Sequence, residues 1–253
     1  MKSVTGRLVS MAMVVVGGMI LSADSMQAQG REEFRFGFFG GININMVGTG
    51  ASNMSTIDSN DVLFPLSSDL SDGQGIAPYF GIITEYTTDG VLGLALRLSA
   101  DQRNAEMEDA QSDGSEARVF TARVSYLTIE PGMRFAIGSP NFSFTVGPAL
   151  AVLLSAKYDY DVNGDDTQVE IGGRRIEHMN NVAFGFWGDL GYDIALRGGE
   201  EGERTSIYLT PFLGASWLLD QRKASFATQE ERDDAWTTIS IRTGLQLKFG
   251  SGD

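Results

Sequence analysis

The chain has 253 residues, long enough for one large β domain or two small domains. It has no cysteine, which excludes a disulfide framework and thiolate chemistry, and its net charge of −14 argues against nucleic-acid binding. Beyond the N-terminus there is no run of about 18 apolar residues, so no membrane-spanning helix is predicted for the mature chain.

The N-terminus has the pattern of a secretory signal peptide. Lys2 and Arg7 form a positive beginning, and an uncharged apolar stretch follows over residues 8–21. A membrane anchor is the alternative, but the apolar stretch is short for a spanning helix. We therefore predict a signal peptide over residues 1–28 and an exported mature domain over residues 29–253.

After residue 30 the sequence falls into eight segments in which large apolar residues alternate with small, polar or charged ones. A period of two places successive side chains on opposite faces of a β-strand. In chain order the segments are residues 33–46, 76–87, 92–99, 127–137, 142–157, 183–197, 207–219 and 239–249.

The polar faces of these segments are rich in Gly, Ala, Ser and Thr, with few charges between them. A solvent-facing strand normally carries long polar side chains, whereas small residues suit a narrow barrel interior. The apolar faces are long enough for tilted strands to cross a bilayer. A soluble barrel has the same period with the apolar face inside, but the composition favours a membrane barrel with that face outside.

The connections between the segments alternate between long and short. Outer-membrane barrels have long external loops and short periplasmic turns, and a soluble barrel has no reason to sort its loops in this way. The pattern predicts an all-β, eight-stranded antiparallel up-and-down transmembrane β-barrel in the outer membrane of a diderm bacterium. The predicted external loops are residues 48–75, 101–117, 159–180 and 220–236.

Over residues 31–249 the chain resembles the small outer-membrane β-barrels of the OmpA type and the PorT-like type. The resemblance rests on the signal peptide, the alternating segments, the run from Ser125 to Pro131 and a last strand that ends in the aromatic Phe249. It implies outer-membrane lipid and, during biogenesis, the barrel-assembly machinery as partners. A PorT-like protein would be an accessory of protein secretion.

Charged residues on the small-residue faces are the candidate site. The interior of eight strands is just wide enough for side chains to fill it, and charges buried there must pair. We expect a ladder of ion pairs that plugs the lumen, with a narrow selective pore as the alternative. The predicted lumen charges are Glu33, Arg35, Glu85, Arg97, Glu130, Arg134, Lys157, Asp189, Asp193, Arg197, Arg242 and Lys248.

One acidic stretch matches the calcium-loop pattern D-x-[DN]-x-[DN]-G-x5-E, in which oxygen ligands alternate and a glycine allows a sharp turn. The alternative is an acidic hairpin without metal, and no other cofactor is predicted. The candidate calcium ligands are Asp159, Asp161, Asn163, Asp165 and Glu170.

No metalloprotease, Walker or serine-hydrolase motif occurs in the sequence. The single histidine, His178, could meet Ser206 or Ser216 in a lipid-modifying enzyme, but nothing in the sequence specifies that contact. We predict a non-enzymatic protein that serves envelope structure, or binds envelope or surface proteins through acidic external loops. A PorT-like secretion accessory, a narrow pore and a membrane lipid enzyme are the alternatives.

Overall fold

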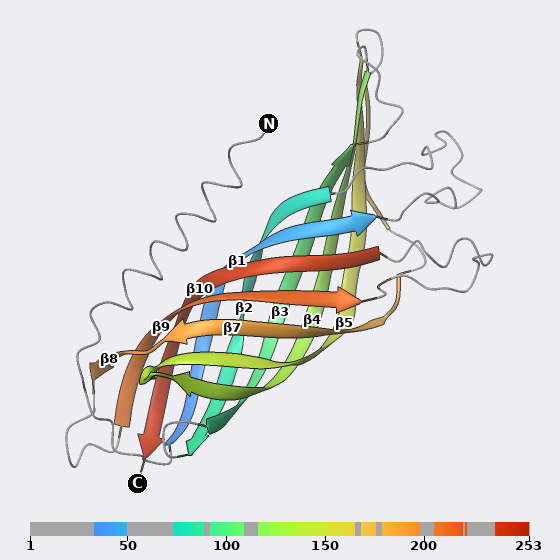
Figure 1. Cartoon of the computed structure of the whole chain (residues 1–253). Helices are drawn as coiled ribbons and strands as arrows, with labels where there is room; N and C mark the ends of the chain where they lie inside the picture. Colours follow the sequence, from blue (N-terminus) through green and yellow to red (C-terminus); the bar gives the residue numbers. More distant parts are fainter. Residues whose placement is uncertain are drawn as a thin grey trace.

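The computed structural model describes residues 33–49, 73–88, 92–108, 116–164, 168–175, 179–197, 205–219, 221 and 236–252. Their regular elements are all β-strands (Figure 1). Within these ranges no helix is long and apolar enough to cross a membrane. The predicted signal peptide lies outside the described residues, as do Asp165 and His178.

All pairings in the sheet are antiparallel, and most strands pair with the next one in the chain. They are β1 (Glu33–Thr49), β2 (Gly73–Thr88), β3 (Leu92–Glu108), β4 (Glu116–Ile137), β5 (Ser139–Gly164), β6 (Gln168–Arg175), β7 (Val182–Tyr192), β8 (Ile194–Arg197), β9 (Thr205–Leu219) and β10 (Trp236–Gly252).

The sheet closes on itself. The path β1-β2-β3-β4-β5-β7-β9-β10 returns to β1, because β10 pairs with both β9 and β1. The short β8 follows β7 in the chain and pairs with β9, and β6 pairs with β5 beside the ring. The predicted eight-stranded up-and-down barrel is therefore confirmed, and closure leaves no free edge around the ring.

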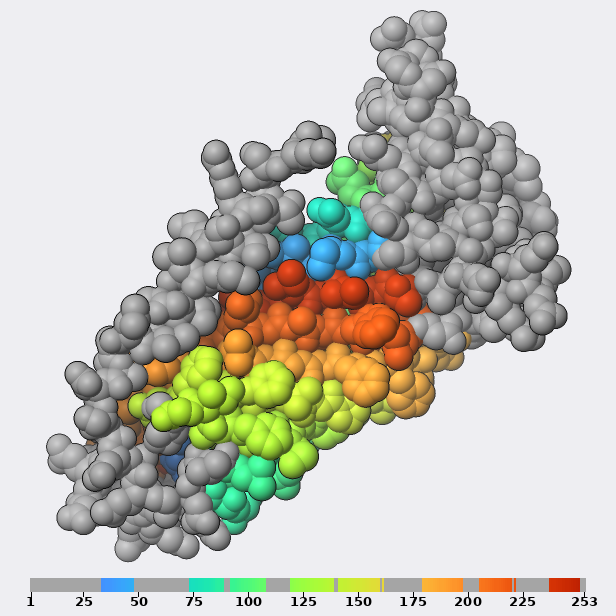
Figure 2. Space-filling view, in the orientation of Figure 1, coloured from blue at the N-terminus to red at the C-terminus, as the bar shows by residue number. Residues whose placement is uncertain are grey.

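The large apolar side chains point away from the barrel interior. In β1, Phe38 is 53% exposed and the next residue, Phe39, only 5%. In β4 the exposed apolar positions run from Leu127 to Ile137, and about 9–11 tilted residues span a bilayer. Figure 2 shows β1 (blue), β10 (red) and β9 (orange) forming a continuous wall. The apolar faces are thus the lipid-facing surface.

The two ends of the barrel differ. Glu33 at the start of β1 pairs with Gly252 at the end of β10, so we call this end the terminal end and the opposite one the loop end. At the terminal end β4 and β5 are joined through Gly138, whose φ of 67° lies in the left-handed region. A side chain with a Cβ would be strained there, so this tight turn requires glycine.

The strands are longer than predicted at the loop end, where β3, β4 and β5 rise above the rest (Figure 1). The residues that were expected in loops but are strand are 48–49, 73–75, 101–108, 116–117, 159–164, 168–175 and 236. The prediction stopped where the outward face ceased to be apolar, as at Gln102. A strand continues wherever a neighbour accepts its backbone hydrogen bonds, and here both neighbours continue together.

Two glycines in the β1–β2 pair differ in the space around them: Gly81 is crowded, and Gly40 is open. A Cβ on Gly81 would lie 2.1 Å from the Leu98 carbonyl oxygen and 2.8 Å from Cζ of Phe39, whereas one on Gly40 meets nothing within 4 Å. We expect Gly81→Val to lower the free energy of unfolding by about 1–3 kcal/mol, because the interior has no space for the larger side chain. Gly40→Val should leave it unchanged or raise it slightly.

The measurement is urea unfolding of the mature chain refolded into lipid vesicles, read by the gel-mobility difference between unheated and heated protein. Equal unfolding midpoints for the two variants would contradict the close approach at Gly81.

Candidate functional site

The barrel interior holds equal numbers of acidic and basic side chains among the described residues. Each has an oppositely charged partner at ion-pair distance. The six acidic ones are Glu33, Glu85, Asp101, Glu130, Asp189 and Asp193, and the six basic ones are Arg35, Arg97, Arg103, Arg134, Arg242 and Lys248. This set has no net charge, although the whole chain carries −14.

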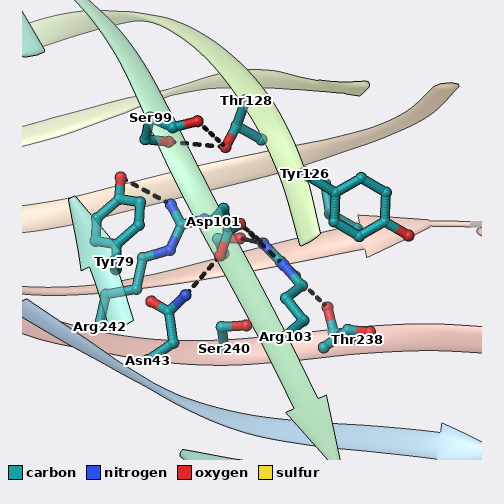
Figure 3. A network of polar contacts seen from close by, with 12 residues as sticks. Asn43, Tyr79, Ser99, Asp101, Arg103, Tyr126, Thr128, Thr238, Ser240 and Arg242 are labelled. Carbon is teal, nitrogen blue, oxygen red and sulfur yellow. Dashed lines mark hydrogen bonds and ion pairs between the residues drawn. The ribbon is translucent and has the colours of Figure 1, made fainter. Parts of the chain in front are cut away.

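Asp101 on β3 is the centre of one group of contacts, shown in Figure 3. Its Oδ2 accepts hydrogen bonds from Nη2 of Arg103 and from Nη2 of Arg242, both at 2.8 Å. Its Oδ1 accepts one from Nδ2 of Asn43 at 2.5 Å. Arg103 also donates to the Ser216 hydroxyl. One carboxylate therefore connects β1, β3 and β10, and β9 through Arg103.

Arg242 extends this group across the barrel to β4. Its Nη1 donates to Oε1 of Glu130 at 2.6 Å, and the Tyr79 hydroxyl donates to the other oxygen of the same carboxylate at 2.9 Å. The guanidinium carbon lies 4.3 Å from the centre of the Tyr79 ring. Charge-assisted hydrogen bonds of this kind are about twice as strong as neutral ones.

Asp193 is the centre of a second group, toward the terminal end. It accepts hydrogen bonds from Nη1 of Arg35 at 2.5 Å and from Nη2 of Arg134 and Nζ of Lys248, both at 3.0 Å. Nζ of Lys248 also donates to Glu85 Oε2 at 2.9 Å. Three cations and two carboxylates thus share this level of the lumen.

A third pair, Arg97 with Asp189, is surrounded by aromatic rings. The Arg97 guanidinium carbon lies 4.6 Å from the centre of the Trp187 ring and 5.5 Å from those of Phe39 and Phe212. The rings give this cation both packing and an electrostatic attraction to their faces. Charge and apolar bulk therefore alternate along the interior.

The loop end of the interior is apolar. Met107, Phe120, Tyr126 and Leu218 are completely buried there, and Tyr158 is stacked on Phe120 with ring centres 5.1 Å apart. The Tyr126 hydroxyl at this cluster donates a hydrogen bond to Gln221 at 3.1 Å. Above the charged groups, the interior is thus filled by a small hydrophobic core.

Lys157 was predicted in the lumen, but it is exposed on the outer wall of β5. The pairing of β4 with β5 shifts between Ser125 and Tyr126, which are opposite Ser155 and Leu153, so Leu154 is an extra residue in β5. A bulge of this kind reverses which alternate residues face inward. A strict period of two could not show it.

Arg197 was also predicted in the lumen and is exposed. It lies in β8, where every residue is exposed, because this strand pairs with β9 and extends past the last β5–β7 pair, Phe142 with Tyr192. The lumen face of this segment ends at Asp193. The other ten predicted charges lie in the interior.

Asp101 and Arg103 are the interior charges that the sequence interpretation missed. Both were assigned to the loop at 101–117, yet they continue the small-residue face of β3 that includes Arg97 and Ser99. Continued alternation on the inner face was the signal that could have found them. With Lys157 and Arg197 replaced by Asp101 and Arg103, the interior charges balance.

The candidate calcium ligands do not form a loop in the described part of the hairpin. Residues 159–164 end β5 and pair with β6, so that Asp161 is opposite Glu170 and Asn163 is opposite Gln168. Backbone pairing extends the stretch, whereas a calcium loop wraps its oxygens around the ion. The described residues contain no group of three or more metal-ligating His, Cys, Asp or Glu side chains. Calcium binding, which also needs Asp165, stays a prediction.

The two candidate nucleophiles lie at different places along β9. Ser206 is near the terminal end and bonds to Glu33, whereas Ser216 is buried beside Arg103. His178 lies outside the described residues, and its neighbour Met179 belongs to the apolar cluster at the loop end. A contact between His178 and either serine stays a hypothesis.

Comparison with known families decides what kind of barrel this is. The family model described as "Outer membrane protein beta-barrel domain" matches residues 27–210. The chain belongs to this family. This outer-membrane β-barrel is accordingly located in the outer membrane of a diderm bacterium, as the sequence predicted. No curated protein matches the chain.

Solved structures similar to this outer-membrane barrel have low identity to it. OprG from Pseudomonas aeruginosa is 9% identical, with 90% of this chain and 99% of that chain covered and a TM-score of 0.36. Neisserial surface protein A is 7% identical, with 84% and 95% covered and a TM-score of 0.34. Ail of Yersinia pestis, in complex with the heparin analogue sucrose octasulfate, is 10% identical, with 85% and 98% covered and a TM-score of 0.33.

Removing Asp101 should destabilise this barrel strongly. Asp101→Ala leaves Arg103 without its carboxylate and Arg242 with Glu130 alone, and we expect a loss of about 3–5 kcal/mol in unfolding free energy. Urea unfolding in lipid vesicles measures it. Asp159→Asn, which breaks an ion pair with Arg123 on the outer wall, is the control and should cost at most about 1 kcal/mol.

The double variant Asp101→Leu with Arg103→Met should recover part of the loss, because both charges leave together. If Asp101→Ala costs no more than Asp159→Asn, the interior ion pairs do not stabilise the fold in the way proposed.

Proposed function

We propose that the protein is a closed, non-enzymatic outer-membrane barrel that anchors an extracellular interaction surface. The observation that carries this proposal is the filled interior: ion pairs cross the membrane-embedded part, and the apolar cluster follows at the loop end. An eight-stranded barrel has just enough interior space for such side chains.

Opening a conducting path would require breaking these pairs. Arg103, Arg134 and Arg242 are the three largest of the fully buried side chains. Arg103 and Arg242 both pair with Asp101 on β3, and Arg134 pairs with Asp193, which follows β7. A charge that is left buried without its partner costs about 3–5 kcal/mol. A narrow pore would need several pairs to separate at once, which favours the plug over the pore.

The loop end supports a role in surface interaction. There β3, β4 and β5 continue beyond the apolar belt, and their outward positions become polar and acidic, with Gln102, Glu106 and Asp159 among them. A rigid sheet holds a binding surface more precisely than a loop does. We propose an envelope or surface protein as its partner.

The engagement of Ser206 and Ser216 supports the non-enzymatic part of the proposal. Ser216 accepts a hydrogen bond from a buried, charged arginine, and Ser206 bonds to a glutamate that also pairs with Arg35. A nucleophilic serine needs a base within hydrogen-bond reach that removes its proton. Arg103 is a donor and cannot be that base for Ser216, and the Glu33 carboxylate beside Ser206 is held in an ion pair with Arg35.

Planar-bilayer recording tests the closed lumen. We expect the refolded protein to show no stable open state, with insertion verified independently by protease protection of the barrel. Arg103→Ser with Arg242→Ser removes two of the largest interior side chains and should raise the leak current, which shows that the recording can detect an opened lumen. A stable open state of the unaltered protein would reject the plug.

A further inference from the structure

Two basic side chains lie next to each other on the outer wall. Arg123 on β4 and Lys157 on β5 are partners in the strand register, and both point away from the interior. The Arg123 side chain is 59% exposed. The register continues to β6, where the backbone of Arg175 is opposite Lys157. Basic residues thus occupy one level of three adjacent strands.

This level lies just above the lipid-facing belt. The nearest exposed apolar side chains toward the terminal end are Leu127, four residues from Arg123, and Leu154, three residues from Lys157. At about 3.3 Å per residue and a tilt of about 40°, these steps raise the cations by about 8–10 Å. The polar layer on each side of the hydrocarbon core is about 5–8 Å thick, and long basic side chains reach back into it.

The outward positions of these strands change in a definite order along the barrel. The strongly exposed apolar residues end at Leu127 and Leu154, and the cations Arg123 and Lys157 follow toward the loop end. Beyond them β5 carries the acidic Asp159 and Asp161. Arg123 forms an ion pair with Asp159, so one acidic group already competes for it. On a chain of net charge −14, two neighbouring cations at the membrane boundary form a local basic site that attracts anions.

We propose that Arg123 and Lys157 form a binding site for the phosphate groups of outer-leaflet lipopolysaccharide. Arginine fits phosphate oxygens through a planar fork of donors, and lysine adds a point charge beside it. Their spacing across one strand pair allows two phosphates, or two oxygens of one phosphate, to be held together. The site depends on the loop end facing the cell exterior and not on whether the lumen is closed.

Native mass spectrometry of the refolded mature chain in detergent tests the site, with diphosphoryl lipid A and its dephosphorylated form as probes. A basic residue near a charged membrane surface contributes about fivefold in affinity, the factor that corresponds to ~1 kcal/mol. R123Q combined with K157Q should therefore weaken diphosphoryl lipid A by about 25-fold. The dephosphorylated lipid should bind the double variant and the unaltered protein equally.

Two further variants test whether binding of the phosphorylated lipid depends on local charge and on the position of the cations. D159N removes the competing carboxylate and should strengthen binding of the phosphorylated lipid. R197Q removes an exposed arginine at the terminal end and is the matched control. The affinity of this variant for diphosphoryl lipid A should equal that of the unaltered protein. Equal binding by R123Q/K157Q and the unaltered protein, or an equal loss in R197Q, would overturn the site. Gel mobility of each variant verifies that the barrel is folded.

Discussion

The whole structure depends on one constraint: in lipid, every backbone N–H and C=O must find a partner within the protein. The ring meets it through β10, which pairs with β1 over its whole length and with β9 on its other side. Closure forces one face of every strand into a narrow interior and the other into hydrocarbon. The alternation of Phe38 outside with Phe39 inside follows from this geometry.

A narrow interior in turn decides how its charges behave. Water has little room there, so Asp101 and Asp193 each receive two or more cationic donors. These carboxylates connect strands that are not neighbours in the ring, which the backbone ladder cannot do. The plug that we propose follows from the same side chains that stabilise the barrel.

The residues on the outer wall change from apolar to charged where the barrel passes from lipid to water. Its belt on β4 ends at Leu127, Ser125 occupies the next outward position, and the cation Arg123 follows. The acidic Asp159 on β5 lies farther toward the loop end. The strands continue through all three environments because β4 and β5 remain paired. Membrane anchoring, lipid contact and the proposed interaction surface thus share one continuous sheet.

The sequence by itself determined the eight strands of the ring, the inside-out faces and ten of the twelve predicted interior charges, because a period of two is a local property of the chain. Only the tertiary structure placed Lys157 outside, since the bulge at Leu154 depends on the register with β4. It also brought Asp101 and Arg103 inside, because strand length at the loop end is decided by neighbouring strands. The pairing of carboxylates with cations across the lumen depends on closure of the ring. No single segment of the sequence determines that closure.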